Sequence, residues 1–191
     1  MRVSRMVNTA LIATLATAIH VARAEEVIDF ESLPPELPGW SAVKLAGDRP
    51  SEYRTADKWD APFSFALDAD RPRAGSNSLK CEFSQEVAGI SFGPPVLPAS
   101  GTVEIRFFVR SAGLTDQEGA LIVAAFDSDN KPLNGYREVA KIPASEDWVE
   151  VSWTNSLSPE AAGVRLIFAY KSLPADAKIW IDDISVKTVP N

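Results

Sequence analysis

The strongest constraint on the fold is that the apolar runs of this chain are short and alternate with other residues. In the segment 102–110, Val103, Ile105 and Phe107 alternate with polar or aromatic neighbours. Pro, Gly, Asp and Asn separate such runs, and no long segment has the apolar period of a helix. Alternation with a period of two is typical of strands with one buried face. About ten such runs predict an all-β domain, built as a two-sheet antiparallel jelly-roll β-sandwich.

The expected strands are distributed over the chain from residue 27 onward. Between them, the polar segment 47–60 is expected to be a loop, although it contains Tyr53 and Trp59. The expected strands are 27–31, 40–45, 62–68, 79–84, 89–93, 102–110, 120–126, 137–142, 148–153, 164–170 and 178–186. The sequence shows no internal repeat or linker, so we expect a single domain.

The segment 178–186 carries large apolar residues on both faces, which predicts a central strand that is covered on both sides. Asp182 and Asp183 interrupt this apolar run. A carboxylate in a buried strand is costly unless it is paired, and a bound cation is one suitable partner. We therefore expect this strand to close the sandwich and to help bind a structural Ca²⁺ ion.

The N-terminal segment 1–24 has the pattern of a cleaved signal peptide. Arg2 and Arg5 precede the apolar run 7–19, and Ala22-Arg23-Ala24 forms an A-x-A cleavage site. The apolar run is too short for a transmembrane helix, so no membrane insertion is expected after cleavage. The expected mature chain is therefore 25–191, exported to the periplasm or outside the cell, and an uncleaved N-terminal anchor is the alternative.

Removal of the signal peptide limits the available chemistry. The single histidine of the chain, His20, lies in this segment, as do both methionines. Without histidine, the mature chain cannot use a His-containing catalytic triad, a His-ligated zinc ion or a histidine pH switch.

The charge of the chain narrows the range of partners. The full sequence has a net charge of −7, and the signal peptide contains basic but no acidic residues. An acidic surface repels nucleic acid and anionic lipid, so a neutral ligand or a divalent cation fits better. The single cysteine, Cys81, excludes an intrachain disulfide. Its alternation with Leu79 and Phe83 favours a buried, inert thiol over a reactive one.

Several segments together resemble the jelly-roll carbohydrate-binding modules of the CenC type, families 4, 9 and 22, and the wider galactose-binding-like sandwiches. The matching segments are Asp29-Phe30-Glu31, Gly39-Trp40-Ser41, Gly75-Ser76-Asn77-Ser78-Leu79-Lys80, Phe107-Phe108-Val109-Arg110, Trp148 and Trp180-Ile181-Asp182-Asp183-Ile184. Their order and spacing extend over nearly the whole mature chain. The resemblance implies a β-sandwich that binds carbohydrate, although this fold hosts many functions.

The resemblance also implies a structural Ca²⁺ site. In the family, an acid of the first strand, groups before the Gly-Ser-x-Ser-Leu turn and an Asp of the last strand hold the ion. These positions correspond to Glu31, backbone oxygens near 73–76, and Asp182, with Asp183 as the reserve ligand. Carboxylates and loop carbonyls suit the oxygen coordination of Ca²⁺. The alternative is that backbone amides cap these acids and that no ion binds.

Aromatic residues outside the alternating core positions are the candidates for sugar contact. Trp40, Tyr53, Trp59 and Tyr136 lie in expected loops or at strand ends, where they either pack locally or meet a ligand. The outward residues Arg106, Phe108, Arg110 and Arg165 could line a groove or form a solvated sheet face. Trp153, Tyr170 and Trp180 are expected in the core.

The sequence therefore predicts an exported, non-catalytic, monomeric domain that binds a poly- or oligosaccharide. No nucleotide-binding, serine-hydrolase or metal-type cysteine motif is present, and no catalytic residue is assigned. One alternative is an envelope structural or adhesion protein that uses the same fold to bind a protein. Another is a small jelly-roll hydrolase or lyase that uses a pair of its many acids.

Overall fold

The computed structural model describes residues 25–46, 49–55, 63–87, 89–114, 117–133 and 135–189, with only the backbone for 43–46 and 49–55. Within this part the chain forms strands and contains no helix, so no described helix could cross a membrane. The strands are β1 Glu25–Ile28, β2 Ser41–Ala46, β3 Arg49–Thr55, β4 Phe63–Asp68, β5 Ser78–Phe83, β6 Ile90–Gly93, β7 Leu97–Pro98, β8 Thr102–Ala112, β9 Gly119–Phe126, β10 Arg137–Ile142, β11 Val149–Ser156, β12 Gly163–Tyr170 and β13 Lys178–Val189.

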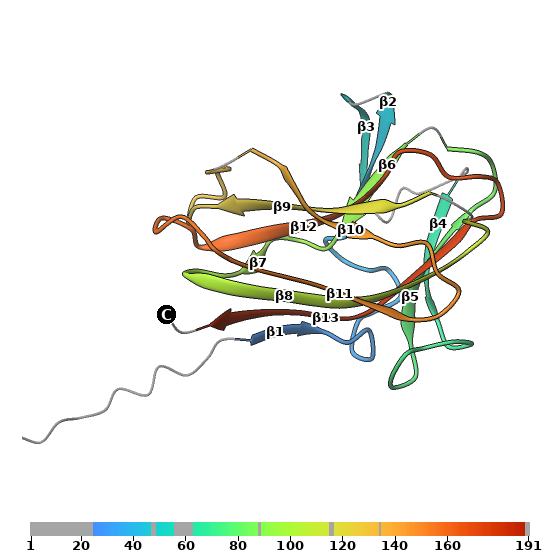
Figure 1. Ribbon diagram of the computed structural model, residues 1–191, viewed down its shortest axis with the longest axis horizontal. Helices are drawn as coiled ribbons and strands as arrows, with labels where there is room; N and C mark the ends of the chain where they lie inside the picture. Colours follow the sequence, from blue (N-terminus) through green and yellow to red (C-terminus); the bar gives the residue numbers. More distant parts are fainter. Residues whose placement is uncertain are drawn as a thin grey trace, which may run out of the picture.

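The strands form two antiparallel sheets that pack face to face (Figure 1). Sheet A has six strands in the order β11-β8-β13-β5-β4, and β1 also pairs with β13. Sheet B has seven strands in the order β10-β9-β12-β6-β2-β3, and β7 also pairs with β12. The predicted two-sheet antiparallel sandwich is confirmed. The central position of β13 is confirmed as well, because it lies between β8 on one side and β5 and β1 on the other.

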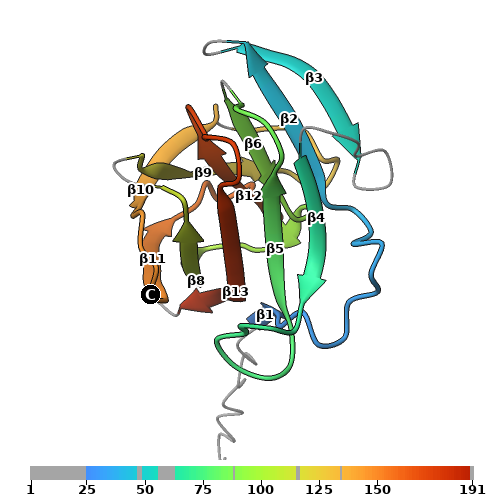
Figure 2. The same ribbon diagram turned by 90° about the vertical axis from the view of Figure 1, so that its right-hand side faces the viewer.

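The prediction of a loop over 47–60 is wrong for the segment 49–55, which forms β3 and pairs with β2 (Figure 2). This strand is the outermost member of sheet B, so its second edge has no neighbouring strand in the described part. Edge strands tolerate proline and charged residues because only one side of the ladder is paired. The polar sequence of β3, which includes Pro50 and Glu52, therefore hides a strand from periodicity.

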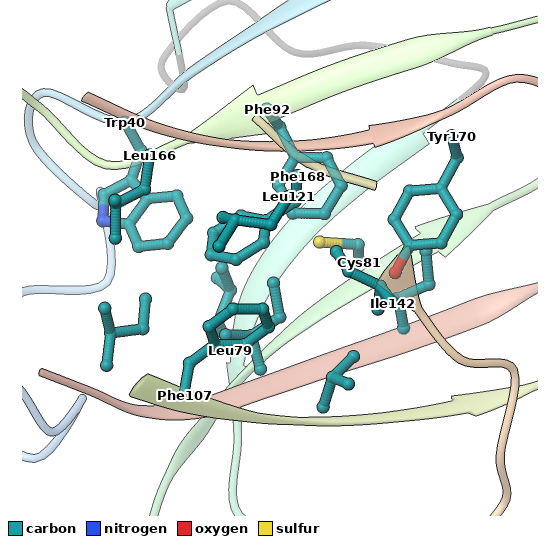
Figure 3. Packing of buried hydrophobic residues seen from close by; sticks show 14 of the residues in the cluster. Trp40, Leu79, Cys81, Phe92, Phe107, Leu121, Ile142, Leu166, Phe168 and Tyr170 are labelled. Atoms are coloured by element: carbon teal, nitrogen blue, oxygen red, sulfur yellow. The ribbon is translucent and has the colours of Figure 1, made fainter. Parts of the chain in front are cut away.

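The core lies between the two sheets and consists of the inward residues that alternation predicted. Phe107 of β8 and Phe168 of β12 meet across it, with ring centres 5.0 Å apart in an edge-to-face arrangement (Figure 3). Phe92 of β6 extends this contact, with its ring centre 5.6 Å from that of Phe168. All three side chains are buried. Aromatic pairs of this geometry add about 0.5–1.5 kcal/mol each beyond the area that they bury.

Two further side chains in Figure 3 complete the centre of this core. Cys81 is fully buried, and burial raises the pKa of its thiol well above the ordinary value. A thiol that stays protonated is a poor nucleophile, so the geometry agrees with the inert thiol predicted from sequence. Tyr170 is also buried, as predicted, and burial raises the pKa of its hydroxyl.

Trp40 provides a test of the core packing. Its side chain is only 1% exposed, and its ring centre lies 5.8 Å from that of Phe30. Replacement of a fully buried Trp by Ala leaves a large cavity, so Trp40→Ala should lower the free energy of unfolding by about 3–5 kcal/mol. Guanidinium unfolding measures this loss. The exposed aromatic Tyr136 is the control, and Tyr136→Ala should change stability by less than about 0.5 kcal/mol; equal losses would contradict this packing.

Candidate functional site

The residues that sequence analysis grouped as one sugar-binding site lie on two different sheets. Arg106 and Phe108 belong to β8 of sheet A, whereas Tyr136 immediately precedes β10 at the edge of sheet B. Tyr53 lies on β3 of sheet B, in register with Val43 of β2, and only its backbone is described. Because the outer faces of a sandwich point in opposite directions, these residues cannot form one continuous groove.

The prediction that Trp40 contributes to an exposed platform is wrong. The side chain is 1% exposed and packs in the core beside Phe30, which has a left-handed backbone conformation with φ 59°. The turn between β1 and β2 therefore folds Trp40 inward instead of presenting it to solvent. Trp59, another candidate, lies outside the described residues.

Tyr136 is the candidate that the structure exposes to solvent. Its side chain is 55% exposed, and among the described residues only Val27, at 53%, is a comparably exposed large apolar side chain. Val27 lies on β1 of sheet A. The part of the chain with described side chains therefore offers one strongly exposed aromatic ring, and it lies on the side of sheet B.

The outer face of sheet B beside this edge carries aliphatic side chains on β9 and β12. Ala120 and Ile122 of β9 are in register with Ala169 and Ile167 of β12, and all four are partly exposed. Their neighbours in the strands, such as Leu121, point into the core. Alternation therefore places these four aliphatic side chains on the outer face of the sheet.

Arg165 of β12 lies on the same face, as do the charged residues Glu138 and Lys141 of β10, which pair with Ile122 and Ala120. Its guanidinium carbon lies 5.4 Å from the ring centre of Phe126 on β9, a cation–π contact. Its Nε atom is buried and makes no hydrogen bond among the described residues. At least one N–H group of the Arg165 guanidinium therefore lacks a hydrogen-bond partner among the described residues.

The outer face of sheet A has the opposite character, because charged side chains cover its aromatic rings. Lys80, Trp180 and Arg110 lie in register across β5, β13 and β8. The guanidinium carbon of Arg110 lies 4.8 Å from the centre of the Trp180 ring, and Trp180 Nε1 donates to Asp68 Oδ2 at 2.6 Å. Trp180 is thus buried as predicted, but on the outer side of the sheet and not between the sheets.

The charges around Trp180 hold one another in place. Burial alone would raise the pKa of Asp68, but hydrogen bonds from Trp180 and from the Asp70 amide, together with Lys80, outweigh it and lower this pKa. The ammonium of Lys80 lies 3.7 Å from Asp68 Oδ2. On the other side of the ring, Arg110 Nε donates to the carbonyl of Glu146 at 2.5 Å. These groups are used in packing, and they leave no open aromatic surface here.

Phe108 is likewise covered. The guanidinium carbon of Arg73 lies 3.5 Å from the centre of the Phe108 ring, and the same guanidinium forms an ion pair with Asp183. The ring is therefore only partly exposed and cannot stack on a ligand without displacement of Arg73. Arg106, two residues earlier on β8, is exposed to solvent.

Asp182 holds the segment that carries Arg73 against sheet A. Its carboxylate is fully buried and accepts hydrogen bonds from the amides of Arg73 at 2.9 Å, Asp183 at 2.8 Å and Ala74 at 3.4 Å. Burial raises the pKa of Asp182, and the amides offset this in part. These contacts correspond to the alternative in which backbone amides cap the acid.

Glu31 holds the other end of the same segment. Its Oε1 accepts hydrogen bonds from the amides of Ser76 at 2.7 Å and Asn77 at 2.8 Å. Gly75 has φ 63°, and a Cβ atom there would lie 2.5 Å from this oxygen. The turn therefore requires glycine, both for its conformation and for the approach of the carboxylate. Together, Glu31 and Asp182 fix the segment 73–77, which we call the clamped loop.

A β-bulge separates the two neighbouring acids of β13. The register with β8 shifts between Asp182 and Ser185, and Asp183 has φ 48°. Strict alternation would place Ile184 on the face of Asp182. The bulge instead turns Ile184 into the core, where it is fully buried.

Of the predicted calcium ligands, Glu31 and Asp182 therefore lie at the two ends of the clamped loop with backbone amides as partners, whereas Asp183 pairs with the guanidinium of Arg73. No group of three or more acidic, cysteine or histidine side chains that could hold a metal occurs in the described part. The predicted ligand set relied on loop carbonyls in addition to two carboxylates, so the calcium site stays a prediction.

A cleft that sequence analysis did not anticipate opens at the end of sheet A. Its volume is about 390 Å³, and its lining includes Ser64, Glu82, Asp176 and Lys178 from the ends of β4, β5 and β13. These residues are far apart in the sequence and belong to no motif. Only the strand register, which pairs Ser64 with Glu82 and Glu82 with Lys178, brings them together.

No protein-family model matches the chain, and no curated protein sequence matches it. Solved structures do resemble it. The CBM22-1 xylan-binding domain from Paenibacillus barcinonensis Xyn10C is 19% identical, with a TM-score of 0.53 over 87% of this chain and 94% of that chain. TmCBM61 in complex with β-1,4-galactotriose is 12% identical, with a TM-score of 0.55 over 83% of this chain and 92% of that chain.

The fold is that of a carbohydrate-binding module. The resemblance predicted from sequence motifs is thereby confirmed for the fold. The same sandwich also occurs within an enzyme. The enzymatically active domain of bacteriophage CBA120 tailspike protein 4 matches with a TM-score of 0.57 and 13% identity, over 78% of this chain but only 19% of that chain.

The contribution of the clamped loop can be measured by one matched pair of variants. Asp182→Asn replaces one carboxylate oxygen by an amide group, which cannot accept the backbone hydrogen bonds that this oxygen receives. We expect it to lower the free energy of unfolding by about 2–3 kcal/mol, because buried amides lose their partner. Asp183→Asn removes only the half-exposed ion pair with Arg73 and should cost less than about 1 kcal/mol. Urea unfolding of both variants checks the difference, and equal effects would contradict the clamp.

Proposed function

We propose that this chain is an exported, non-catalytic domain that binds a polysaccharide. The observation that carries the proposal is the extent of the likeness to the CBM22-1 xylan-binding domain, which includes 94% of that chain. The sandwich thus corresponds to a whole binding module. Xylan and β-1,4-galactotriose, named for the two similar modules, make neutral polysaccharides the first ligands to test.

The outer face of sheet B is the binding surface that we assign. Tyr136 at its edge is 55% exposed and supplies an aromatic ring on which the C–H face of a pyranose can stack. The partly exposed aliphatic side chains of Ile122 and Ile167 supply an apolar surface against which a polymer can pack. Arg165, which is partly exposed on the same face, supplies the terminal N–H donors of its guanidinium for sugar hydroxyls.

A second candidate function is adhesion to a protein partner in the cell envelope. The observation that favours it is the covering of Phe108 and Trp180 by Arg73 and Arg110, which leaves the outer face of sheet A without an open aromatic row. Retention on polysaccharide separates the two functions, because only the first requires it.

Tyr136→Ala tests the binding surface. If the ring stacks on sugar, its removal should lower retention of the chain 25–191 on insoluble xylan or galactan by about tenfold in affinity, which corresponds to about 1.4 kcal/mol. Val27→Ala is the matched control, because Val27 is 53% exposed but belongs to sheet A. Its retention should equal that of the unmodified chain.

The outcomes of this experiment are distinct. Full retention of Tyr136→Ala would exclude Tyr136 from the binding surface. No retention of the unmodified chain on any neutral polysaccharide would overturn glycan binding and favour the protein-binding alternative. Cooperative thermal unfolding of each variant shows that any loss of retention is not a loss of fold.

A structural Ca²⁺ ion belongs to the same proposal. Glu31, Asp182 and carbonyl oxygens of 73–76 are the groups that would hold it, and Ca²⁺ accepts such mixed carboxylate and carbonyl sets. In the described contacts only Oε1 of Glu31 accepts hydrogen bonds, so its second oxygen keeps its lone pairs. An ion there would supplement the amides in fixing the clamped loop.

Removal of calcium tests the proposed structural ion. An ion that binds only the folded state stabilises it by about 2.7 kcal/mol at one hundred times its dissociation constant, so chelation should lower the midpoint of thermal unfolding. Glu31→Gln should abolish the effect of added Ca²⁺, whereas Glu36→Gln, at an exposed position outside the clamp, should preserve it. An unchanged midpoint on chelation would leave the amides as the sole partners of these acids.

A further inference from the structure

The cleft at the end of sheet A is built on a rigid frame. Ser64, Glu82 and Lys178 form a row across β4, β5 and β13, so three paired strands fix their positions. The turn before β13 closes one side, because Asp176 N donates to the carbonyl of Phe83 at 2.7 Å and Phe83 N donates to that of Ala177 at 3.1 Å. A volume of about 390 Å³ is within the usual range for small-molecule sites.

The cleft presents hydrogen-bonding groups of both kinds side by side. Lys178 Nζ lies 3.0 Å from Glu82 Oε1, and the two side chains are 44% and 38% exposed. An ammonium has three donors and a carboxylate about four acceptor sites, so each group keeps capacity after their mutual contact. Ser64 and Ser84 belong to the same lining.

The charges of the cleft indicate a neutral ligand. The hydrogen bond from Lys178 lowers the pKa of Glu82, although burial opposes it, so this carboxylate is ionised at neutral pH. Lys80 Nζ, 3.6 Å from the same oxygen, adds a second cation beside it. The lining itself contains two acids, Glu82 and Asp176, and one base, Lys178, and with Lys80 beside it the site attracts neither sign of charge strongly.

We propose that this cleft is a second saccharide site, which binds one neutral pyranose unit. An adjacent acceptor and donor, Glu82 and Lys178, match the acceptor and donor groups of two neighbouring ring hydroxyls. The buried ring of Phe63 in the lining supplies an apolar wall for the C–H groups of the sugar. The site lies on sheet A and does not depend on the polysaccharide surface assigned to sheet B.

The test is a titration of the ¹⁵N-labelled chain 25–191 with methyl β-D-xyloside and methyl β-D-galactoside, followed by amide chemical shifts. We expect at least one glycoside to shift the amides of Ser64, Ser84 and Lys178 in a saturable way. Lys178→Met should weaken this binding by about tenfold, because it removes the donor of the pair. Lys141→Met is the matched control: it breaks the exposed pair of Lys141 with Glu118, outside the cleft, and should leave the affinity unchanged.

Each result decides the proposal. An absence of saturable shifts at the cleft, or unchanged affinity in Lys178→Met, would overturn it. If Lys178→Met loses its dispersed spectrum, Glu82→Gln replaces it and should weaken binding in the same way. Shifts confined to Tyr136 and its neighbours would overturn the second site but support glycan binding on sheet B. Retention on polysaccharide is measured separately, so failure of one site is distinguishable from failure of the other.

Discussion

The buried carboxylate of Asp182 is the constraint on which the outer face of sheet A depends. It lies in the central strand β13 and accepts hydrogen bonds from backbone amides of the clamped loop, so the loop must cross this face. Arg73 is thereby placed over the ring of Phe108 and beside Asp183. Because the bulge turns Asp183 outward, the two neighbouring acids serve different partners, one the backbone and the other a guanidinium. A single buried acid thus places the clamped loop and Arg73 over the aromatic ring on this face.

Alternation of apolar residues was sufficient to predict the sheets, because the core selects one face of each strand. It succeeded for β8 and β12, in which every second residue is buried and the partner strands lie on both sides. It failed for β3, where pairing on one edge removes the need for apolar residues. It also failed at Ile184, because a bulge adds one residue to the strand and reverses the face. Local pattern therefore predicts elements better than it predicts their irregularities.

The candidate site was less predictable, because exposure depends on groups distant in the sequence. Trp40 follows a proline-rich turn and looks like a loop residue, yet it is buried beside Phe30. Phe108 is on an outward face, as alternation requires, yet Arg73 covers it. Both outcomes depend on where loops cross the sheets, which no local pattern contains. Asp182 was the exception, since the cost of burying a charge made it conspicuous in its strand.

The two faces of the sandwich therefore differ in what they offer a ligand. On sheet A the energy of the cation–π and ion-pair contacts is already used within the protein, and a ligand would have to replace them. On sheet B the exposed ring of Tyr136 has no such partner among the described residues, and Arg165 has only the cation–π contact with Phe126. Since binding is favourable only when new contacts exceed those broken, a polymer gains more on sheet B. The end of sheet A remains suited to a small ligand, because Glu82 and Lys178 keep free hydrogen-bonding capacity without displacement of any ring contact.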